Sequence, residues 1–201
     1  EHEPDIFLGG ENTIGHFLGV DLGIRNIAVD SDGDRHSGDV VETVRSKILT
    51  LRSALQSAGT KSAKRHLKKL AGKEARFRSH TNHVISKKLV AKAKDTGRGL
   101  ALEDLKGIRD RVTVRRAQRA KHSSWSFFQL RAFVTYKAII AGVPLVLVDP
   151  RNTSRTCPEC GYCDKRNRRS QSEFVCKSCG FAANADHVGA RNIARRGSVI
   201  S

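Results

Sequence analysis

The five cysteines of the chain lie within one window of 23 residues near its C-terminal end. Four of them form two pairs, Cys157-x2-Cys160 and Cys176-x2-Cys179, with fifteen residues between the pairs. Each pair presents two sulfurs from one tight turn, and two such turns complete a tetrahedron. Because thiolates favour zinc over magnesium, we predict a zinc site with these four cysteines as ligands. Cysteine fills all four positions, so we expect the zinc to be structural.

The residues around the two pairs support the same interpretation. Gly161 and Gly180 follow the second cysteine of each pair, where a metal-binding turn needs backbone freedom. Cys163 breaks the paired spacing, and we interpret it as a free thiol rather than an alternative ligand. Clustered cysteines in a chain that begins with EHEPDIFLGG, which is not a signal peptide, indicate metal binding in a reducing compartment. The loop between the pairs is rich in Arg and Lys, and it either contacts nucleic acid or is simply solvated.

Three acidic residues stand where the surrounding pattern predicts burial. The apolar run Phe17–Val20 ends on Asp21, and the run Leu100–Leu102 ends on Glu103. In the segment NADHVGARNIARRG, helical spacing places Asp186 on a stripe of apolar and small residues. An unpaired charge on such a face is costly. A metal ion, a cationic partner or a structural salt bridge must therefore compensate each carboxylate.

Convergence of these carboxylates would create a site for hard cations. If neighbouring strands carry the first two acids and the last helix packs across the sheet, the three groups would repel one another without Mg²⁺ or Mn²⁺. Two such ions, roughly 4 Å apart, can activate a water and stabilise the leaving oxygen of a phosphodiester. Asp30, Asp104 and Asp149 meet the same description. The residues alone therefore leave the choice of acids open.

The elements that must position these residues begin with strands. We predict strands at 17–21, 26–30 and about 35–43, with SDGD at 31–34 as a hairpin turn. From about residue 45 the apolar spacing becomes helical. Gly59 and Thr60 separate one helix from a second, basic one that runs from about 62 to 94.

The second half of the chain alternates strands and helices. We predict a strand within 97–105, a basic helix or loop at 108–121, an amphipathic helix at 124–141 and a strand at 143–148. Ser123 or Ser124 can cap the amphipathic helix and Gly142 can end it; Asn184 can cap a final helix. Consecutive strands followed by strand–helix alternation predict an α/β fold, with a mixed sheet flanked by helices.

The charge of the chain is large and uneven. The formal net charge is +17, and residues 1–44 hold ten acidic and two basic residues, whereas residues 45–201 hold ten acidic and 35 basic residues. Such an excess indicates a polyanionic partner, most often nucleic acid, although a merely solvated basic surface has the same composition. The basic residues from Lys61 to Lys94 favour a clamp on phosphate backbones over a solvated hairpin.

Composition also limits the compartment. No apolar run approaches the roughly 20 residues of a membrane span, and VPLVLV (143–148) is short enough to be a buried strand. We therefore expect no membrane association, and the clustered cysteines favour a reducing compartment such as the cytoplasm.

Several segments, in this order, resemble the TnpB family of transposon-encoded proteins, which are related to type V CRISPR effectors. They are GVDLGIRNIAV, LALEDLKGI, YKAIIAGVPLVLVDPRNTSRTCPECG and FVCKSCGFAANADHVGARNIARRG. The resemblance implies an RNase H-like (RuvC-like) nuclease domain over 14–150, with a helical insertion at about 45–95 and a completing segment at 184–197. It also implies an inserted four-cysteine zinc ribbon over 151–183 and leaves 1–13 as a lead-in.

The same resemblance assigns roles to residues and partners. The family's catalytic acids fall on Asp21, Glu103 and Asp186, which would bind Mg²⁺ or Mn²⁺, with two ions expected. The implied activity is that of a metal-dependent, RNA-guided DNA endonuclease. A guide RNA would select the target, and the DNA would be cut as a single strand. The basic segments 45–121 would hold nucleic acid and feed a strand to the acids.

Only about 16 residues precede the first catalytic motif, whereas full-length family members carry a large N-terminal region there. We therefore expect either a C-terminal fragment or a truncated gene, with a complete catalytic centre. An alternative is a nucleic-acid-binding remnant that keeps the fold but does not cut on its own. A third possibility is a zinc-ribbon binding protein whose acids are structural. The oligomeric state does not follow from the sequence.

Overall fold

In the computed structural model, which describes residues 16–23, 25–104 and 127–200, five strands form one mixed sheet in the order β3-β2-β1-β4-β5. Their bounds are β1 Phe17–Asp21, β2 Asn26–Asp30, β3 Arg35–Ser37, β4 Gly99–Glu103 and β5 Leu145–Val148. β1, β2 and β3 pair antiparallel, whereas β1, β4 and β5 pair parallel. The predicted mixed sheet flanked by helices is confirmed.

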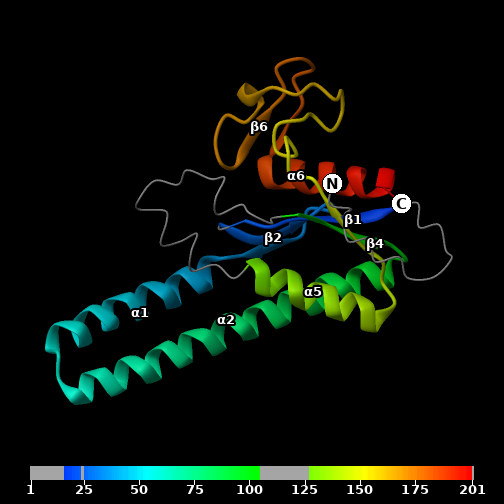
Figure 1. The fold of residues 1–201 in the computed structure, drawn as a ribbon. Helices are drawn as coiled ribbons and strands as arrows, with labels where there is room; N and C mark the ends of the chain where they lie inside the picture. The colour runs from blue at the N-terminus through cyan, green and yellow to red at the C-terminus, as the bar shows by residue number, and fades with distance from the viewer. Residues whose placement is uncertain (1–15, 24, 105–126, 201) are drawn as a thin grey trace, which may run out of the picture.

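Helices cover both faces of this sheet (Figure 1). α6 (Ala185–Ile200) crosses one face, while α2 (Lys61–Asp95) and α5 (Phe127–Ala141) lie against the other. Because β1 and β4 are covered on both faces, nearly every position in them is apolar or glycine. The sheet is therefore the middle layer of three.

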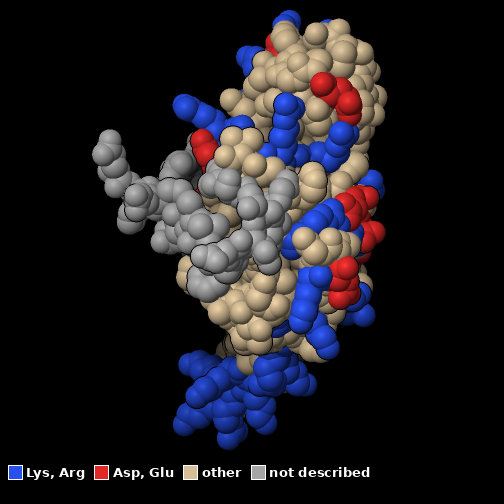
Figure 2. Space-filling view, turned by 90° about the vertical axis from the view of Figure 1, so that its right-hand side faces the viewer, with Lys and Arg blue, Asp and Glu red and all other residues tan. Residues whose placement is uncertain are grey.

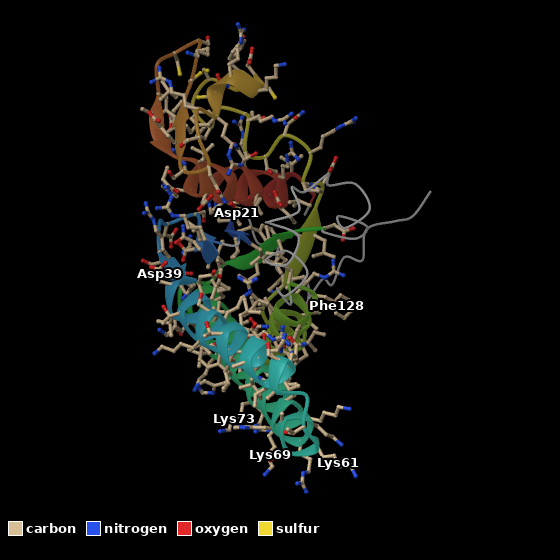
Figure 3. The ribbon with its side chains drawn as sticks, turned by 90° about the vertical axis from the view of Figure 1, so that its left-hand side faces the viewer. Asp21, Asp39, Lys61, Lys69, Lys73 and Phe128 are labelled. Atoms are coloured by element: carbon tan, nitrogen blue, oxygen red, sulfur yellow. The ribbon has the colours of Figure 1, made fainter. Side chains whose placement is uncertain are left out.

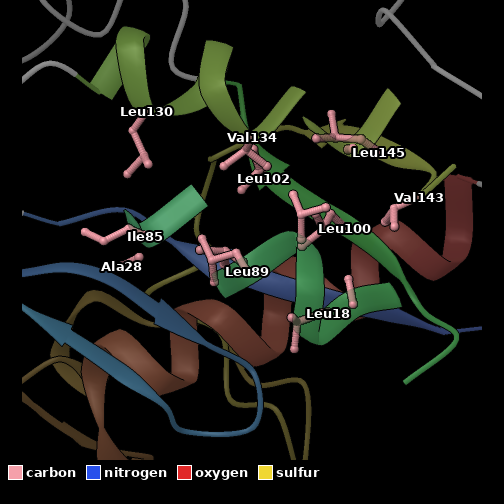
Figure 4. Close-up of a cluster of buried hydrophobic side chains, with 14 of the residues drawn as sticks. Leu18, Ala28, Ile85, Leu89, Leu100, Leu102, Leu130, Val134, Val143 and Leu145 are labelled. Atoms are coloured by element: carbon pink, nitrogen blue, oxygen red, sulfur yellow. The ribbon is translucent and has the colours of Figure 1, made fainter. Parts of the chain in front are cut away.

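Two apolar clusters hold the layers together. Between the sheet and α2 and α5, the larger cluster contains Leu18, Leu102, Leu89 and Val134 among its buried members (Figure 4). The smaller cluster joins the other face to α6 through Phe17, Ala101, Val146, Val148 and Ile193. Successive strand residues thus point to opposite faces, as the two-residue period of a strand requires.

α6 lies unusually close to the sheet because small residues face each other there. A Cβ atom added to Gly19 of β1 would lie 2.1 Å from the carbonyl oxygen of Ala190, and one added to Gly197 would lie 2.8 Å from Cβ of Ala101. Real Cβ atoms essentially never lie within 3.0 Å of such atoms. The close approach brings the first turn of α6 next to the end of β1.

α1 (Asp39–Ala58) and α2 form a long helical hairpin. Gly59 ends α1 with a φ of 63°, and the side chain of Thr60 caps α2 by accepting from the backbone N–H of Ala63. The predicted break at Gly59 and Thr60 is confirmed, but the helical region begins at Asp39 rather than at about 45. The predicted third strand at 35–43 was therefore too long, since β3 ends at Ser37. Asp39 and Glu42 lie in the first helical turn, where acids favour the helix dipole.

The chain then leaves α5 for the last strand of the sheet. Gly142 follows α5 with a φ of 67°, as predicted. β5 begins at Leu145 rather than at 143, because Pro144 has no N–H to donate to the ladder. The predicted basic segment 108–121 and the capping role of Ser123 or Ser124 lie outside the described residues.

Residues between β5 and α6 form a small separate layer over α6 (Figure 1). It contains a short 3₁₀ helix η1 (Lys165–Asn167) and the two-stranded sheet of β6 (Glu173–Val175) and β7 (Ala182–Asn184). Its own core includes Cys157, Phe174 and Cys176, packed with Val188 of α6. No helix in the described part of the chain is both long and apolar enough to cross a membrane.

Candidate active site and metal centre

Asp21 and Glu103 end neighbouring parallel strands. Val20 of β1 is in register with Leu102 of β4, so the next residue of each strand is the acid. The carboxyl ends of parallel strands meet at the same edge of a sheet. Asp21 and Glu103 therefore share that edge, and the predicted placement of both acids at strand ends is confirmed by the geometry.

Asp186 reaches the same region from the first turn of α6. Asn184 caps this helix, because its Oδ1 accepts from the backbone N–H groups of Asp186, at 3.1 Å, and His187, at 3.3 Å. The side chain of Asn26, in β2, donates to Asp186 Oδ2 at 2.9 Å. Gly189, one turn further along α6, has no side chain at the place where a Cβ would lie 3.1 Å from Asp21 Oδ2. α6 thus carries Asp186 to the end of β1.

The electrostatics show that these acids act on each other. Burial, followed by the negative charges of Glu103 and Asp186, raises the pKa of Asp21 from 3.8 to about 8. Burial also raises the pKa of Glu103. An acid with a pKa near 8 is largely protonated at neutral pH unless a cation is present. The negative charge at this edge is therefore only partly compensated by the chain itself.

Groups that sequence reasoning missed provide part of that compensation. Thr153 donates its hydroxyl to Glu103 Oε1. Arg168 has its Nη2 at 3.8 Å from Asp186 Oδ1. The positive charge of Arg168 opposes the rise in the pKa of both Asp21 and Glu103. The only sequence signal for Arg168 was the basic character of its loop, and the sequence carried no signal for Thr153.

A buried amide holds Thr153 in place. Asn192 of α6 donates from Nδ2 to the backbone carbonyls of Thr153, at 2.7 Å, and Thr156, at 2.8 Å. Asn192 is only 6% exposed. The segment that leads into the cysteine region is therefore tied to the helix that carries Asp186.

The other candidate acids have partners of their own. Asp30 is 1% exposed and binds Lys92, which also contacts Asp32 at 3.0 Å and Asp34 at 2.8 Å. Asp104 pairs with Arg131 at 2.9 Å. Both acids therefore have a cationic side chain as a partner.

Asp149 acts directly on Glu103, because its negative charge contributes to the raised pKa of that carboxyl. Its Oδ1 accepts from the backbone N–H of Arg151 at 2.9 Å, which closes a local turn. That turn gives Asp149 a structural role beside the three candidate acids.

The four paired cysteines form a compact group. Within the described ranges, they are the only set of three or more His, Cys, Asp or Glu residues whose ligand atoms all lie within 4.8 Å of one another, and the three acids do not meet this criterion. The Sγ atoms of Cys157 and Cys179 are 3.7 Å apart, and those of Cys160 and Cys176 are 3.6 Å apart. Zinc–sulfur bonds of about 2.3 Å in a tetrahedron place sulfurs about 3.8 Å apart. The arrangement therefore fits a four-sulfur zinc site.

The two cysteine turns have the same backbone geometry. The N–H of Gly161 donates to the carbonyl of Cys157 at 3.0 Å, and the N–H of Gly180 donates to that of Cys176 at 3.1 Å. Both glycines have a positive φ, 75° and 76°, which explains the predicted need for glycine. Cys163 is exposed and stands apart from the group of four, as the free-thiol interpretation expects.

The chain matches the models and members of a known protein family. Family models described as "Probable transposase" and "Cas12f1-like, TNB domain" match residues 10–109 and 127–193. A TnpB-like protein of Methanocaldococcus jannaschii is 28% identical over 198 residues, covering 90% of this chain and 69% of that protein. The chain belongs to the TnpB family. The resemblance inferred from the sequence motifs is confirmed.

TnpB relatives among the CRISPR effectors are longer than this chain. The CRISPR-associated endodeoxyribonuclease Cas12f1 of Sulfoacidibacillus thermotolerans is 41% identical over 129 residues, which is 64% of this chain and 29% of that protein. Cas12f1 of Syntrophomonas palmitatica is 30% identical over 199 residues, which is 90% of this chain and 39% of that protein. The chain thus spans between a quarter and two fifths of these nucleases.

The fold of this TnpB-family chain matches solved Cas12f structures. A cryo-EM structure of a Cas12f1–sgRNA–target DNA complex aligns with a TM-score of 0.73 at 19% identity, covering 94% of this chain and 52% of that one. A Cas12f ternary complex aligns with a TM-score of 0.71 at 21% identity, covering 96% and 40%. The chain therefore has a Cas12f-like fold.

Proposed function

We propose that this chain is the nuclease part of an RNA-guided DNA endonuclease, with an RNase H-like (RuvC-like) domain and an inserted zinc ribbon. The observation that supports this most directly is the edge where Asp21, Glu103 and Asp186 act on one another. Their mutual repulsion and their burial are unfavourable for folding. Bound cations would offset that cost, and such costs are typical of functional sites. Named relatives of the family are endodeoxyribonucleases.

The proposed domain limits follow the elements. Residues 14–150, with the helical insertion, and 184–197 would form the nuclease domain, and residues 151–183 would form the ribbon. The α1–α2 hairpin is that insertion. Asn192 and Thr153 hold the ribbon segment to the nuclease domain at the catalytic edge.

We assign Asp21, Glu103 and Asp186 as ligands for Mg²⁺ or Mn²⁺. Carboxylate oxygens are the donors that these hard cations prefer, and the raised pKa of Asp21 to about 8 indicates uncompensated negative charge. When bound, a pair of such ions supplies an activated water and stabilises the leaving oxygen of a phosphodiester.

The chain's own side chains orient these ligands. Asn26 holds Asp186 Oδ2, and Thr153 holds Glu103 Oε1, so each acid keeps its second oxygen for other contacts. Arg168 carries a positive charge beside the acids, where the phosphate of a DNA strand would approach. The candidate centre thus combines fixed carboxylates with the positive charge of Arg168.

We assign structural zinc to Cys157, Cys160, Cys176 and Cys179. The Sγ–Sγ distances of 3.6 and 3.7 Å support this ligand set. Thiolate ligands and a DNA substrate both favour the reducing cytoplasm or nucleoid of a prokaryotic cell. Zinc would hold the ribbon that presents Arg168 to the acids.

The proposed partners are a target DNA, cut as a single strand, and a guide RNA. The matched Cas12f1 structure was solved with sgRNA and target DNA. The net charge of +17 of this chain is compatible with two polyanionic partners. A second candidate function, a nucleic-acid-binding remnant that does not cut, is favoured by the spacing of the three acids, whose ligand atoms do not all lie within 4.8 Å of one another in the described structure.

Incubation with single-stranded DNA and Mg²⁺ or Mn²⁺ tests the nuclease. We expect cleavage by the wild-type chain and at least a hundredfold less by Asp186→Ala, because loss of a metal ligand removes the cation that supplies the chemistry. Equal residual cleavage in both proteins would contradict the nuclease proposal. Retained DNA binding in that case would support the remnant.

A further inference from the structure

The far half of the α1–α2 hairpin projects away from the body of the molecule (Figure 1). Among the described residues, α2 is joined to the body at Asn82, which donates to Gln129 of α5 at 2.9 Å, and at Ile85 and Leu89, which enter the main core. Residues 61–81 of α2 lie before that point and pack against α1. At 1.5 Å per residue, this part of the helix extends about 30 Å beyond the body.

The projecting end carries an uncompensated positive charge. Seven exposed basic residues of α2, here called the basic tip, are Lys61, Lys64, Arg65, Lys68, Lys69, Lys73 and Arg76. Figure 2 shows the blue surface at this end of the molecule, and Figure 3 labels Lys61, Lys69 and Lys73 on it. The only acid in residues 61–81 is Glu74, which already contacts Arg52 at 2.8 Å and Arg78 at 4.0 Å. Among the described residues, none of the seven forms an ion pair.

The spacing of these charges is unfavourable for the isolated helix. Lys64 and Lys68, and likewise Lys69 and Lys73, stand four residues apart and therefore lie beside each other on the helix surface. Like charges at this spacing destabilise a helix. A partner with dense negative charge would turn this repulsion into attraction.

The side chains of the tip also indicate the kind of polyanion. Residues 49–76, on both arms of the hairpin end, include no Phe, Tyr or Trp. Proteins that hold single strands combine positive charge with aromatic side chains on which bases stack. A charged surface without aromatic stacking groups is better suited to contacts with phosphates, which line the outside of a duplex on both strands.

We propose that the basic tip binds the phosphate backbone of a nucleic-acid duplex, at a surface separate from the acids that cut. This inference rests on the proposed function for the identity of the polyanion. The tip contacts phosphates regardless of base sequence, and it anchors a duplex at up to about 30 Å from the body. Binding and cleavage therefore depend on different residues.

The test compares two variants with the same change of charge. The tip variant carries Lys64→Gln, Lys68→Gln, Lys69→Gln and Lys73→Gln. The control carries Lys47→Gln, Lys87→Gln, Lys88→Gln and Lys94→Gln, which replaces exposed lysines of the same two helices outside the tip. Glutamine is a good helix former, so both variants keep their helices, and circular dichroism verifies this.

The probes are a 20-base-pair DNA duplex, an RNA–DNA duplex of the same sequence and an unstructured 20-nucleotide oligo-dT, each with a fluorophore. We expect the tip variant to bind a duplex roughly tenfold or more weakly than the wild type at 50 mM salt. The slope of log K against log[salt] should become less negative by up to about 3.6, because four lysines no longer displace counterions. The control should lose clearly less affinity. The two duplex arms decide whether DNA or RNA–DNA is the partner.

Equal losses in the two variants, or a larger loss for oligo-dT than for the duplexes, would overturn the proposal. We expect the tip variant to cut a short single-stranded DNA at the wild-type maximal rate. That result would separate this surface from the acids that cut. If the wild-type chain does not cut but the tip variant still loses duplex affinity selectively, the nuclease proposal fails and the tip proposal stands.

Discussion

At the residue scale, the environment of Asp21 decides how the candidate centre responds to pH. The folded chain holds the pKa of this carboxyl at about 8, whereas the unfolded chain returns it to its ordinary value of 3.8. Between these two values the folded state keeps a proton that the unfolded state has lost. Without Mg²⁺ or Mn²⁺, the stability of the protein therefore falls as the pH rises through this window.

Replacement of Asp21 by Asn should remove that pH dependence. We expect the zinc-loaded protein, without added Mg²⁺, to gain about 5 °C in Tm at pH 8.5 from Asp21→Asn and much less at pH 5. Added Mg²⁺ should raise the Tm of the wild type at pH 8.5 but leave that of Asp21→Asn nearly unchanged. Thermal unfolding across this pH range checks both expectations, and a pH-independent difference would contradict them.

At the element scale, the turn between β2 and β3 is fastened by one lysine. The three acids of the segment DSDGD surround the ammonium group of Lys92, which comes from the last turn of α2. Backbone N–H groups of Asp32 and Asp34 also donate to Asp30 Oδ1, at 3.0 and 2.9 Å. This contact explains the acidity of the turn, for which the sequence predicted only a hairpin.

Replacement of Lys92 should lower the free energy of unfolding. Lys92→Met leaves Asp30 buried with no cation, and removing one partner of a buried pair typically destabilises a protein by about 3–5 kcal/mol. Because the lysine is a quarter exposed, we expect the lower end of that range. Lys94→Met, at an exposed position two residues away, is the matched control and should change the free energy of unfolding by less than about 0.5 kcal/mol. Urea denaturation of both variants measures the difference, and equal midpoints would refute the role of Lys92.

The approach of α6 to β1 depends on a missing side chain. Gly19→Ala would place a Cβ atom 2.1 Å from the carbonyl oxygen of Ala190, so α6 must move away from the sheet. We expect a loss of about 3 kcal/mol and weaker Mg²⁺ binding, because Asp186 moves with the helix. Gly72→Ala, inside α2, meets only the end of the Arg76 side chain at 3.4 Å and should stabilise the helix by up to about 1 kcal/mol. Urea denaturation measures the free energy of unfolding of both variants. A decrease for Gly19→Ala and an increase for Gly72→Ala would support this packing.

At the scale of the whole molecule, the four-cysteine segment between β5 and α6 and the five-stranded sheet form one unit. Arg168 and Thr153 come from the segment between β5 and α6, yet they contact Asp186 and Glu103. α6 packs against the sheet on one side and carries the ribbon on the other (Figure 1). The state of the ribbon should therefore affect the acids.

A single cysteine substitution tests the proposed zinc ligands of the ribbon. Cys176→Ser should reduce bound zinc from about one ion per chain to nearly none, and the ribbon should become sensitive to protease. Cys163→Ser should keep its zinc, because this exposed thiol stands apart from the four ligands. Zinc analysis of the purified variants measures both, and loss of zinc from Cys163→Ser would contradict the assigned ligand set.

The sequence by itself determined the features that depend on neighbouring residues. The cysteine turns, the glycines that follow them and the cap at Asn184 are local, because each contact joins residues within five positions. Strand and helix periods likewise predicted the mixed sheet. Helix starts were less certain, as the beginning of α1 at Asp39 shows.

Only the tertiary structure decided which acids share an edge and what surrounds them. The parallel register of β1 and β4 sets Asp21 beside Glu103, and the glycine-lined approach of α6 brings Asp186 to them. Asp30 met the same sequence criterion, but it pairs with Lys92, 62 residues away. Contacts across such separations depend on how whole elements pack, and a local sequence pattern carries no information about that packing.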